Sequence, residues 1–415
     1  MVSPFMPEAE KVAAVRRLLP ATGAGIHLNA GSVGPLSSET AAAMAEAAER
    51  ELAVGRADRA AWPDQLERLA EARAAVAAIL ATDLERVALT HSTTDGLNLA
   101  IAALPWATGD AVATTAHEHP AGLGPLVALR DRLGVELRVV AIEEDADDDA
   151  IVRDLAAAAA GARAIVVSHV LWTTGRVMPV ARIADAVRGA GTWVIVDGAQ
   201  AAGAILARPD ELGVDAYALS AQKWLLGPEG MGALWLGDRA LAELIPPVGG
   251  MLGFEAIGAA GEIRWHRTAQ RFEATAFHPP SVVGFARACG WLSMFVGLPW
   301  ATARAASLAG RAADDLRSID GVTVLTPPGN PGPLVAFRVA GWPAPAVVEE
   351  LAIRAFAMVR DIPPIEAVRL SVGWWNTEDE LARVVDVIRL VAGHSPDTLP
   401  RRRLAVLGAD GRPID

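Results

Sequence analysis

The sequence is poor in residue types whose scarcity excludes whole classes of protein. A single cysteine, Cys289, among 415 residues rules out an intramolecular disulfide framework and a cysteine-rich metal site. Acidic residues outnumber basic ones by 49 to 37, and the net charge of −12 argues against a nucleic acid or an anionic membrane as partner, because phosphates would be repelled. The short basic run at residues 401–403 does not change this balance, and we interpret it as a solvated tail.

Segments that would direct the chain into a membrane are also missing. Residues 1–8 contain no basic stretch followed by an apolar run, so no signal peptide is predicted. The apolar run from Cys289 to Trp300 is cut by Gly297 and Pro299 and is shorter than the ~20 residues that a spanning helix needs. With 52% hydrophobic residues, the chain is expected to be a globular cytoplasmic protein with a large core.

The chain is longer than one compact core allows, so two domains are expected. From about residue 85 to 236, short β-branched runs alternate with Ala-rich amphipathic stretches, which is typical of a mostly parallel sheet covered by helices. Strands are predicted at residues 86–89, 111–114, 136–141, 164–167, 193–196, 216–219 and 232–236, and helices at 95–103, 122–133, 148–160 and 180–189.

The remainder of the chain predicts a long Gly-rich loop at 248–261 and then a smaller α+β domain. Helices are expected at 280–296, 300–319 and 378–391, and strands at 322–325, 334–339 and 367–372. We place the large domain at 25–275, the small domain at 276–395 with residues 1–24 joined to it, and a tail at 396–415.

Polar motifs follow the predicted strands at the edge where open α/β sheets bind ligands. Lys223 lies among apolar neighbours, where burial lowers a lysine pKa as imine formation requires. Asp197 ends the strand 193–196. A lysine that forms a Schiff base and a carboxylate that keeps a pyridinium nitrogen protonated are the minimum equipment for pyridoxal phosphate chemistry. Considered alone, a lysine near a Gly-Pro turn is nearly always a surface residue, and an aspartate at a strand end is more often a turn former.

Further donors suit the same cofactor. Ser220 and Gln222 flank Lys223 with groups for a phosphate, and Gln200 is placed to donate to the ring oxygen. Thr93 and Thr94 open a helix whose free N–H groups form an anion site, although a simple N-cap is the alternative.

Two more strand ends carry candidate residues. In His117-Glu118-His119-Pro120 the spacing is unspecific and the rest of a metal set is missing, so no metal site is predicted. We expect His119 to lie over the pyridine ring, with His117 as the second choice. Arg369, in an apolar strand, suits the α-carboxylate of an amino acid, with an interdomain salt bridge as the alternative.

In order and spacing these residues resemble the class V aminotransferase group of fold-type I pyridoxal phosphate enzymes. The group includes cysteine desulfurases, selenocysteine lyases, isopenicillin N epimerase-like proteins and hercynylcysteine sulfoxide lyases. The resemblance runs from about residue 25 to 393 and adds the motifs at 27–31, 168–170 and 375–378. It implies an α/β fold with a large, mostly parallel seven-stranded sheet domain and a smaller α+β C-terminal domain.

The resemblance also implies roles. Lys223 becomes the Schiff-base lysine, Asp197 the pyridinium partner and His119 the ring-stacking residue. Arg369 binds the substrate carboxylate, and specificity is expected in the loops 29–36, 171–174 and 249–261, with Asn29 and Trp172 as substrate-binding residues. Family members are usually homodimers with the active site at the interface, where a partner hydroxyl completes the phosphate site; Thr275 is the candidate.

Three departures from the family pattern are visible. Desulfurases carry a nucleophilic cysteine before the arginine strand, yet residues 320–369 contain none, and Cys289 falls in an apolar helix where a structural thiol is expected. The usual histidine before the lysine is Gln222. The asparagine common after Ser-His-Val is replaced by Leu171-Trp172, and Trp172 is expected to form a wall of the substrate site.

The favoured function is a C–S lyase that removes a sulfur group from Cβ of a cysteine-derived amino acid, with the freed Lys223 as base at Cα. An aminotransferase and an epimerase are the alternatives, and the latter needs a second acid–base group such as His117, His169 or Tyr217. A non-catalytic binding module is a remote alternative, because the lysine, the aspartate and the arginine are all present. No Gly-x-Gly-x-x-Gly motif or P-loop follows the first strands, which argues against a nucleotide-binding protein.

Overall fold

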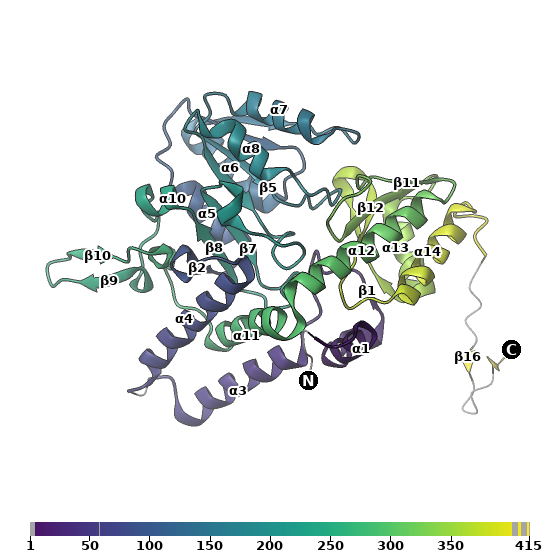
Figure 1. Ribbon diagram of the computed structural model, residues 1–415, viewed down its shortest axis with the longest axis horizontal. Helices are drawn as coiled ribbons and strands as arrows, with labels where there is room; N and C mark the ends of the chain where they lie inside the picture. The colour runs from purple at the N-terminus through teal and green to yellow at the C-terminus, as the bar shows by residue number, and fades with distance from the viewer. Residues whose placement is uncertain (1–4, 58, 401–405, 408–412, 415) are drawn as a thin grey trace.

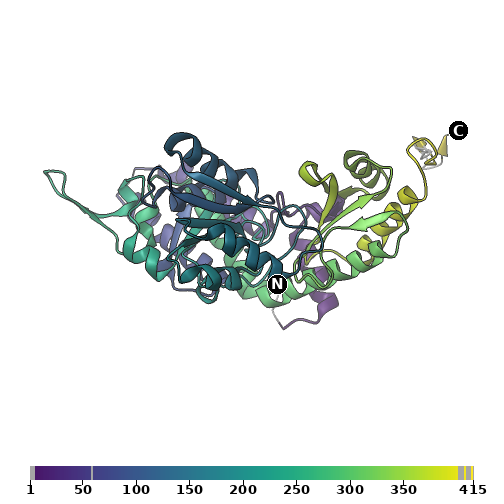
Figure 2. The ribbon, with the colours of Figure 1, turned by 90° about the horizontal axis from the view of Figure 1, so that it is seen from above.

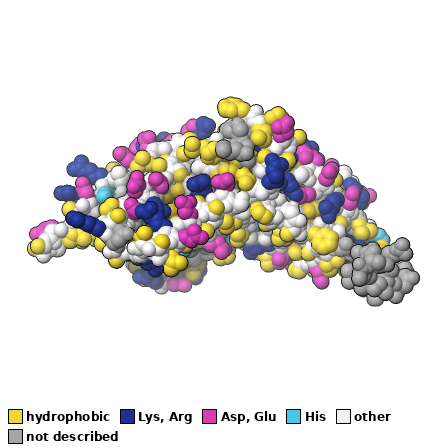
Figure 3. Space-filling model, turned by 90° about the horizontal axis from the view of Figure 1, so that it is seen from below, with side chains coloured by type: hydrophobic (Ala, Val, Ile, Leu, Met, Phe, Trp, Pro, Cys, Tyr) yellow, Lys and Arg dark blue, Asp and Glu magenta, His cyan; other side chains and the backbone are white. Residues whose placement is uncertain are grey.

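The computed structural model describes residues 5–57, 59–400, 406–407 and 413–414. Two sheets lie at opposite ends of an elongated molecule, and the helices α11 and α12 run beneath and between them (Figure 1). Acidic and basic side chains lie intermixed on the face seen in Figure 3. The basic run at 401–403, interpreted above as a solvated tail, lies outside the described residues, as does most of the tail predicted from residue 396.

The large sheet has seven strands in the order β2-β8-β7-β6-β5-β3-β4, and β8 alone runs antiparallel to its neighbours. Its strands lie within one residue of the predicted ends: β2 (Val87–Thr90), β3 (Ala111–Thr115), β4 (Glu136–Val140), β5 (Ala164–Ser168), β6 (Trp193–Asp197), β7 (Ala216–Ser220) and β8 (Gly232–Leu236). Every residue of β5, β6 and β7 is buried, because helices cover both faces of the sheet. The prediction of a large, mostly parallel seven-stranded sheet is confirmed.

Two hydrophobic cores separate the sheet from its helices. Alternate strand residues such as Val167 and Val196 pack against helices on one face, whereas Val166 and Ile195 pack on the other. The first face is covered by α4 (Ala61–Leu80), α7 (Asp148–Ala159) and α8 (Val180–Arg188), and the second by α5 (Thr93–Ala102), α6 (Pro120–Leu133) and α10 (Asp238–Glu243). The short α9 (Pro209–Leu212) precedes β7. Side-chain caps start several of these helices; Ser92, for example, accepts the N–H of Asp95 (3.1 Å).

The small sheet is fully antiparallel, in the order β11-β12-β15-β14, and has a core of its own. Its strands are β11 (Val322–Val324), β12 (Leu334–Val339), β14 (Arg360–Ile362) and β15 (Ala367–Ser371). The helices α12 (Leu298–Arg317), α13 (Ala344–Ala355) and α14 (Glu378–Ala392) pack on it. Thr377 and Glu380 form a capping box at the start of α14. A smaller α+β region in the C-terminal part of the chain is therefore present as expected.

The other helices flank both sheets. They are α1 (Glu8–Leu18), α2 (Ala21–Ala24), α3 (Ser38–Val54) and α11 (Pro279–Gly290), which continues into a π-helical turn at Trp291–Val296. Single 3-10 turns lie at Leu84–Arg86, Met251–Gly253, Ala269–Phe272 and Pro363–Ile365. Helix α11 packs against α3 and α4 of the large-sheet side, so the domain boundary at residues 275 and 276 stays a prediction.

Residues 26–34 run between the two sheets. At one end, β1 (Ile26–His27) pairs in parallel with β13 (Ala357–Met358), and the N–H of Ser371 donates to the carbonyl of Leu28 (2.8 Å). Further along, the side chain of Gln200 donates to the carbonyl of Gly31 (2.8 Å). This segment therefore ties the small sheet to the carboxyl edge of the large one.

The Gly-rich region predicted as a loop is a β-hairpin that projects from the body (Figures 1 and 2). The strands β9 (Phe254–Ile257) and β10 (Ile263–Trp265) pair in antiparallel fashion. Gly261, with φ of 88°, and the bond from the N–H of Gly258 to the carbonyl of Glu262 (2.7 Å) close the turn. The glycines thus shape a tight turn rather than a long loop. A final two-residue pair, β16 (Val406–Leu407) and β17 (Pro413–Ile414), lies in the tail.

No single helix of the described residues is long and apolar enough to cross a membrane. The stretches 279–296 and 298–317 meet that criterion only when taken together, and they are bent by 82° at their junction.

Candidate functional site

A pocket of about 250 Å³ lies at the carboxyl ends of β5, β6 and β7, where the ligand of an open α/β sheet is expected. The large sheet contributes Asp197 and Ser220 from strand ends and Lys223 from the turn after β7. The small sheet contributes Arg360 and Arg369. The other lining residues are Gly31, Ser32, Ser92, Thr93, Thr94, His119, Ala121, Trp172, Ala199, Gln200 and Gln222. Most of the residues predicted from dispersed motifs are therefore brought together in one cavity.

Lys223 and Asp197 influence each other across this pocket. Burial lowers the pKa of the half-buried Lys223 to about 8, opposed by the charge of Asp197 and reinforced by two arginines. Burial raises the pKa of Asp197, and the charge of Lys223 opposes that shift. The carboxylate of Asp197 also accepts the N–H of Ala199 (2.8 Å). A lysine that loses its proton near neutral pH is a competent nucleophile and base.

The start of α5, where an anion site is predicted, lines the pocket. The N–H of Thr93 donates to Oγ of Ser220 (3.0 Å), and the two hydroxyls are hydrogen-bonded to each other (2.6 Å). Gly96 lets the helix approach β7, because a Cβ there would lie 3.0 Å from the Cβ of Ala218. Thr94 is exposed in the same turn. The free N–H groups and hydroxyls of this turn suit a phosphate.

The two glutamines at the site are held differently. Gln200 accepts the indole N–H of Trp224 (3.1 Å) and donates one amide hydrogen to Gly31, which leaves its second amide hydrogen for a ligand. The buried Oε1 of Gln222 has no hydrogen-bond partner among the described residues. Gln222 thus keeps an acceptor for a group that enters the pocket.

Of the two histidines, His119 is the one that lines the pocket. Its Nδ1 accepts the N–H of Ala121 (3.1 Å) at the start of α6, and its ring lies edge-on to Trp172 (5.1 Å between centroids). Burial, with Lys223 and the two arginines, lowers its pKa to about 4, so the ring is neutral at physiological pH. His117 instead contacts Oγ1 of Thr173 (2.8 Å) and does not line the pocket.

Glu118, between the histidines, is a residue that sequence reasoning considered only as a metal ligand. Its buried carboxylate accepts the hydroxyl of Thr115 (2.7 Å) and both the N–H (3.1 Å) and the hydroxyl (2.5 Å) of Ser168. Burial raises its pKa to about 7, and the nearby charge of Asp197 adds to that shift. It ties the His119 turn to β5. No group of three or more His, Cys, Asp or Glu within the described chain is arranged to hold a metal ion.

Arg369 is fully buried on β15 and faces the pocket. Its Nη1 donates to the carbonyl of Trp172 (2.5 Å), whereas Nε and Nη2 have no partner among the described residues. Gly31 lies against it, since a Cβ there would be 2.5 Å from Nη2. Burial and the charge of Arg360 lower the pKa of Arg369 to about 9.

Arg360 was missed. It lies directly opposite Arg369 in the pairing of β14 with β15 and donates to Oγ of Ser32 (3.2 Å). The signal that identified Arg369, an arginine within an apolar run, is also present at Val359-Arg360-Asp361-Ile362. The strand is only three residues long and ends at Pro363, so it was not recognised as a strand.

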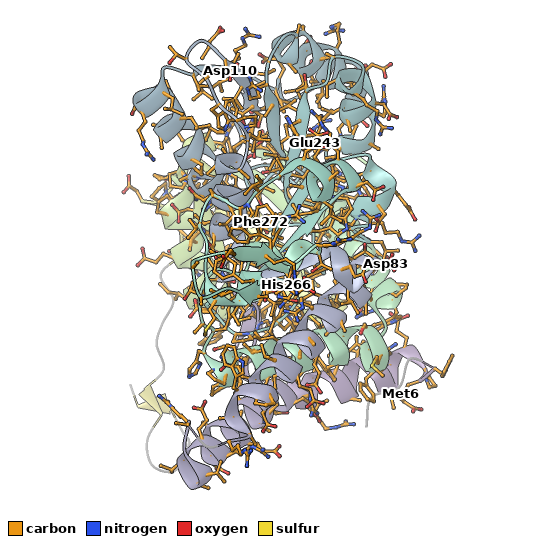
Figure 4. The ribbon with its side chains drawn as sticks, turned by 90° about the vertical axis from the view of Figure 1, so that its left-hand side faces the viewer. Met6, Asp83, Asp110, Glu243, His266 and Phe272 are labelled. Atoms are coloured by element: carbon orange, nitrogen blue, oxygen red, sulfur yellow. The ribbon has the colours of Figure 1, made fainter. Side chains whose placement is uncertain are left out.

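Asn29 and Thr275 lie outside the pocket lining. The side chain of Asn29 accepts the hydroxyl of Ser32 (2.8 Å), so it supports a lining residue. Thr275 is exposed and bonds only the carbonyl of Ala276 (3.4 Å). It follows Phe272, which is buried in the core (Figure 4), and Glu273, whose carboxylate is 2.9 Å from a guanidinium nitrogen of Arg73. Their predicted roles in substrate and phosphate binding remain predictions.

Three groups considered for other chemistry are also away from the pocket. His169 and Tyr217 are both buried and bonded to each other (2.9 Å). Cys289 is fully buried in α11, and burial raises the pKa of its thiol. None of the three lines the cavity.

The residues present fit pyridoxal phosphate. The hydroxyl-lined start of α5, the carboxylate of Asp197 and the lowered pKa of Lys223 supply polar groups that the cofactor requires at one strand edge.

Comparison with known proteins agrees with this geometry. The family model for aminotransferase class V matches residues 37–384. Isopenicillin N epimerase of Streptomyces clavuligerus is 30% identical over 390 residues, which cover 89% of this chain and 95% of that protein. A probable cysteine desulfurase of Halobacterium salinarum is 29% identical over 324 residues, covering 74% of this chain and 76% of that protein.

Solved structures share the fold. A complex of the cystine C–S lyase C-DES with its product cysteine persulfide superposes with a TM-score of 0.84 at 24% identity, covering 91% of this chain and all (100%) of that one. Another structure of C-DES, also with a TM-score of 0.84 and 24% identity, covers 90% of this chain and 98% of that one and holds glycine covalently linked to its pyridoxal phosphate. From its family match, its fold and its site, this chain belongs to the class V aminotransferase family and is a fold-type I enzyme that depends on pyridoxal phosphate.

Proposed function

We propose that this enzyme is a C–S lyase that eliminates the sulfur group from Cβ of a cysteine-derived amino acid as a thiol, after which water converts the remaining three-carbon fragment to pyruvate and ammonia. The observation that carries the proposal is a complete Lys223–Asp197–Arg369 site without a thiol in the pocket. The one cysteine is buried elsewhere, so persulfide formation on the enzyme has no nucleophile. The fold neighbour C-DES, described as a cystine C–S lyase, is consistent with this chemistry.

The chain's own residues are suited to each step. Arg369 would bind the α-carboxylate, Asp197 would hold the ring nitrogen of the cofactor, and the neutral His119 would pack against its ring. Lys223, the predicted Schiff-base residue, takes the proton from Cα once it is free, since a pKa of about 8 leaves part of it neutral. Bound pyridoxal phosphate supplies the electron sink for the charge left at Cα.

The second candidate is an epimerase or an aminotransferase. The 30% identity to isopenicillin N epimerase over 95% of its length favours epimerisation. That reaction needs an acid–base group on the second face of Cα, and His117, His169 and Tyr217 do not line the pocket. Transamination would need no acid–base group other than Lys223.

We also propose a homodimer with the site at its interface. Thr275 is exposed at the end of the segment that carries the hairpin, and the preceding part of that segment also exposes apolar side chains, namely Ile245, Val248, Met251, Ile257 and Ile263. Light scattering should give twice the chain mass. Thr275→Ala should weaken cofactor binding about fivefold, the value of one hydrogen bond. A monomer that keeps full cofactor affinity would exclude a partner contribution.

The decisive experiment is product analysis of the purified, cofactor-loaded protein with S-substituted cysteines and ordinary amino acids, with Lys223→Ala as control. Pyruvate and ammonia from a cysteine conjugate, absent in the variant, would establish the lyase. Conversion of the cofactor to its amine form with a keto acid of the full-length substrate would replace it by the aminotransferase. Loss of the substrate's optical activity without pyruvate would replace it by the epimerase.

A further inference from the structure

Arg360 and Arg369 form a like-charged pair on one face of the small sheet. They are directly opposite each other in antiparallel β14 and β15, so their side chains share a face. Like charges in that position are destabilising, and each lowers the pKa of Lys223 as well. Neither guanidinium forms an ion pair with a carboxylate of the described residues; their hydrogen bonds go to Ser32 and to the carbonyl of Trp172. The two positive charges are therefore not balanced by a carboxylate of the described residues.

Trp172 lies beside this pair. Its indole ring is 5.8 Å from the guanidinium carbon of Arg360, and its own carbonyl holds Arg369. The side chain lines the pocket and is 7% exposed, yet its Nε1–H has no hydrogen-bond partner among the described residues. A buried donor without a partner is costly, which indicates that a ligand satisfies it.

We propose that Arg360 and the indole N–H of Trp172 form a subsite for an anionic group on the substrate side chain. This inference rests on the proposed amino-acid-processing function and names its substrate class. Arg369 takes the α-carboxylate, which leaves Arg360 for a second anion. A guanidinium and an indole N–H are donors only, so the group they receive must be an acceptor, such as a carboxylate or a sulfur oxyanion.

The cofactor phosphate does not account for Arg360. The hydroxyls and N–H groups suited to the phosphate lie at the start of α5, at Thr93 and Ser220 of the large sheet. Arg360 comes from the small sheet and contacts Ser32 and Trp172. The two arginines thus serve the substrate side of the cavity.

The test compares two amino acids of nearly equal shape, S-carboxymethyl-L-cysteine and its neutral amide S-carbamoylmethyl-L-cysteine. The cofactor-loaded Lys223→Ala protein, which cannot turn them over, is titrated with each, and Kd is read from the change in cofactor absorbance. The acid should bind about 10- to 100-fold more tightly, the value of a hydrogen bond to a charged group. Adding Arg360→Gln should remove this preference and leave Kd of the amide unchanged.

Two further variants sharpen the test. Trp172→Phe keeps the ring and removes the N–H, so the preference should fall about fivefold. Arg338→Gln is the matched control: Arg338 lies on β12 of the same sheet and pairs with Glu144 at 3.0 Å, and its loss should leave the preference intact.

Each other outcome overturns the subsite. Equal Kd values for the two ligands would show that no side-chain anion is recognised. If Arg360→Gln weakens both ligands alike, both arginines clamp the α-carboxylate instead. In these two cases the absorbance still responds to amino acids, so the proposed function survives. If no amino acid changes the absorbance, the proposed function fails and the subsite fails with it.

Discussion

The two halves of the pocket differ in how completely their polar groups are paired. On the cofactor side, Thr93 and Ser220 are hydrogen-bonded to each other, Asp197 accepts an N–H, and Gln200 is bonded at both ends of its amide, whereas Oε1 of Gln222 is buried without a partner among the described residues. On the substrate side, Trp172 Nε1, two nitrogens of Arg369 and Oγ of Ser371 are buried without a partner among the described residues. Most polar groups of the first half are paired before a ligand binds, whereas the second half keeps several buried donors unpaired.

Lys223→Ala should have the largest effect, because it removes the base and the attachment point of the cofactor. We expect product formation to fall by at least about 10²- to 10⁴-fold, measured as pyruvate release. The chain has only two lysines, so Lys11→Ala is a natural control. Nζ of Lys11 lies 4.2 Å from the centre of the Trp300 ring, so Lys11→Ala should lower the free energy of unfolding but leave turnover unchanged. Equal activity of wild type and Lys223→Ala would disprove the assignment of the cofactor side.

Glu118→Gln should alter the pH dependence of stability. In the folded wild type the pKa of Glu118 is about 7, above its ordinary value of 4.5, so the folded state binds more protons between pH 4.5 and 7. The contribution of Glu118 to the free energy of unfolding therefore falls as pH rises through that window. The variant should gain on the order of 3 kcal/mol relative to wild type between pH 5 and 8.

Urea unfolding of the cofactor-free proteins at both pH values measures this difference. A constant gap between the two proteins would mean that Glu118 stays ionised throughout. Its hydrogen bonds to Ser168 and Thr115 would then stabilise the charge more than burial penalises it.

Gly31→Ala should impair the substrate side of the pocket without affecting the cofactor side. The added methyl group would contact Nη2 of Arg369 and Oγ of Ser371 but neither Thr93 nor Ser220. We expect KM to rise about 10-fold, a cost of roughly 1.4 kcal/mol, while the cofactor dissociation constant is unchanged. Steady-state kinetics and a cofactor titration report the two quantities. A rise in both KM and the cofactor dissociation constant would show that the two sides of the pocket are not independent.

Ser220→Ala should have the smallest effect, and that effect should be confined to the cofactor side of the pocket. It removes one hydroxyl from the phosphate site, and cofactor affinity should fall about fivefold with KM for substrate unchanged at saturating cofactor. A cofactor titration followed by absorbance measures this. A selective rise in KM would place Ser220 with the substrate residues.

The meeting of Lys223, Asp197 and His119 in one pocket could be predicted from the sequence because these residues follow local rules. Asp197 is the last residue of β6, Lys223 and His119 lie in the turns after β7 and β3, and the carboxyl ends of these parallel strands meet at one edge. Arg360 was missed although it lies in a short apolar run, because its strand is only three residues long and its place opposite Arg369 follows from the pairing with β15. Glycine content suggested a loop at 248–261, whereas Gly258 and Gly261 form the turn of a hairpin.

Long-range pairing was the other limit. Nothing local in the sequence indicates that β1 adds to β13, more than 300 residues away, or that Gly31 passes between Gln200 and Arg369. The sequence also does not show which buried donors lack a partner. For the indole N–H of Trp172, this depends on how segments far apart in the sequence pack together.

The path of residues 26–34 has a practical consequence for anyone who trims this protein. The family match begins at residue 37, which invites a fragment cut at that point. Such a fragment would lack the carbonyl that Gln200 binds, the hydroxyl that orients Arg360 and the backbone that pairs with Ser371. It would retain Lys223, Asp197 and the start of α5 and yet lose the segment that links the arginines of the small sheet to the large sheet.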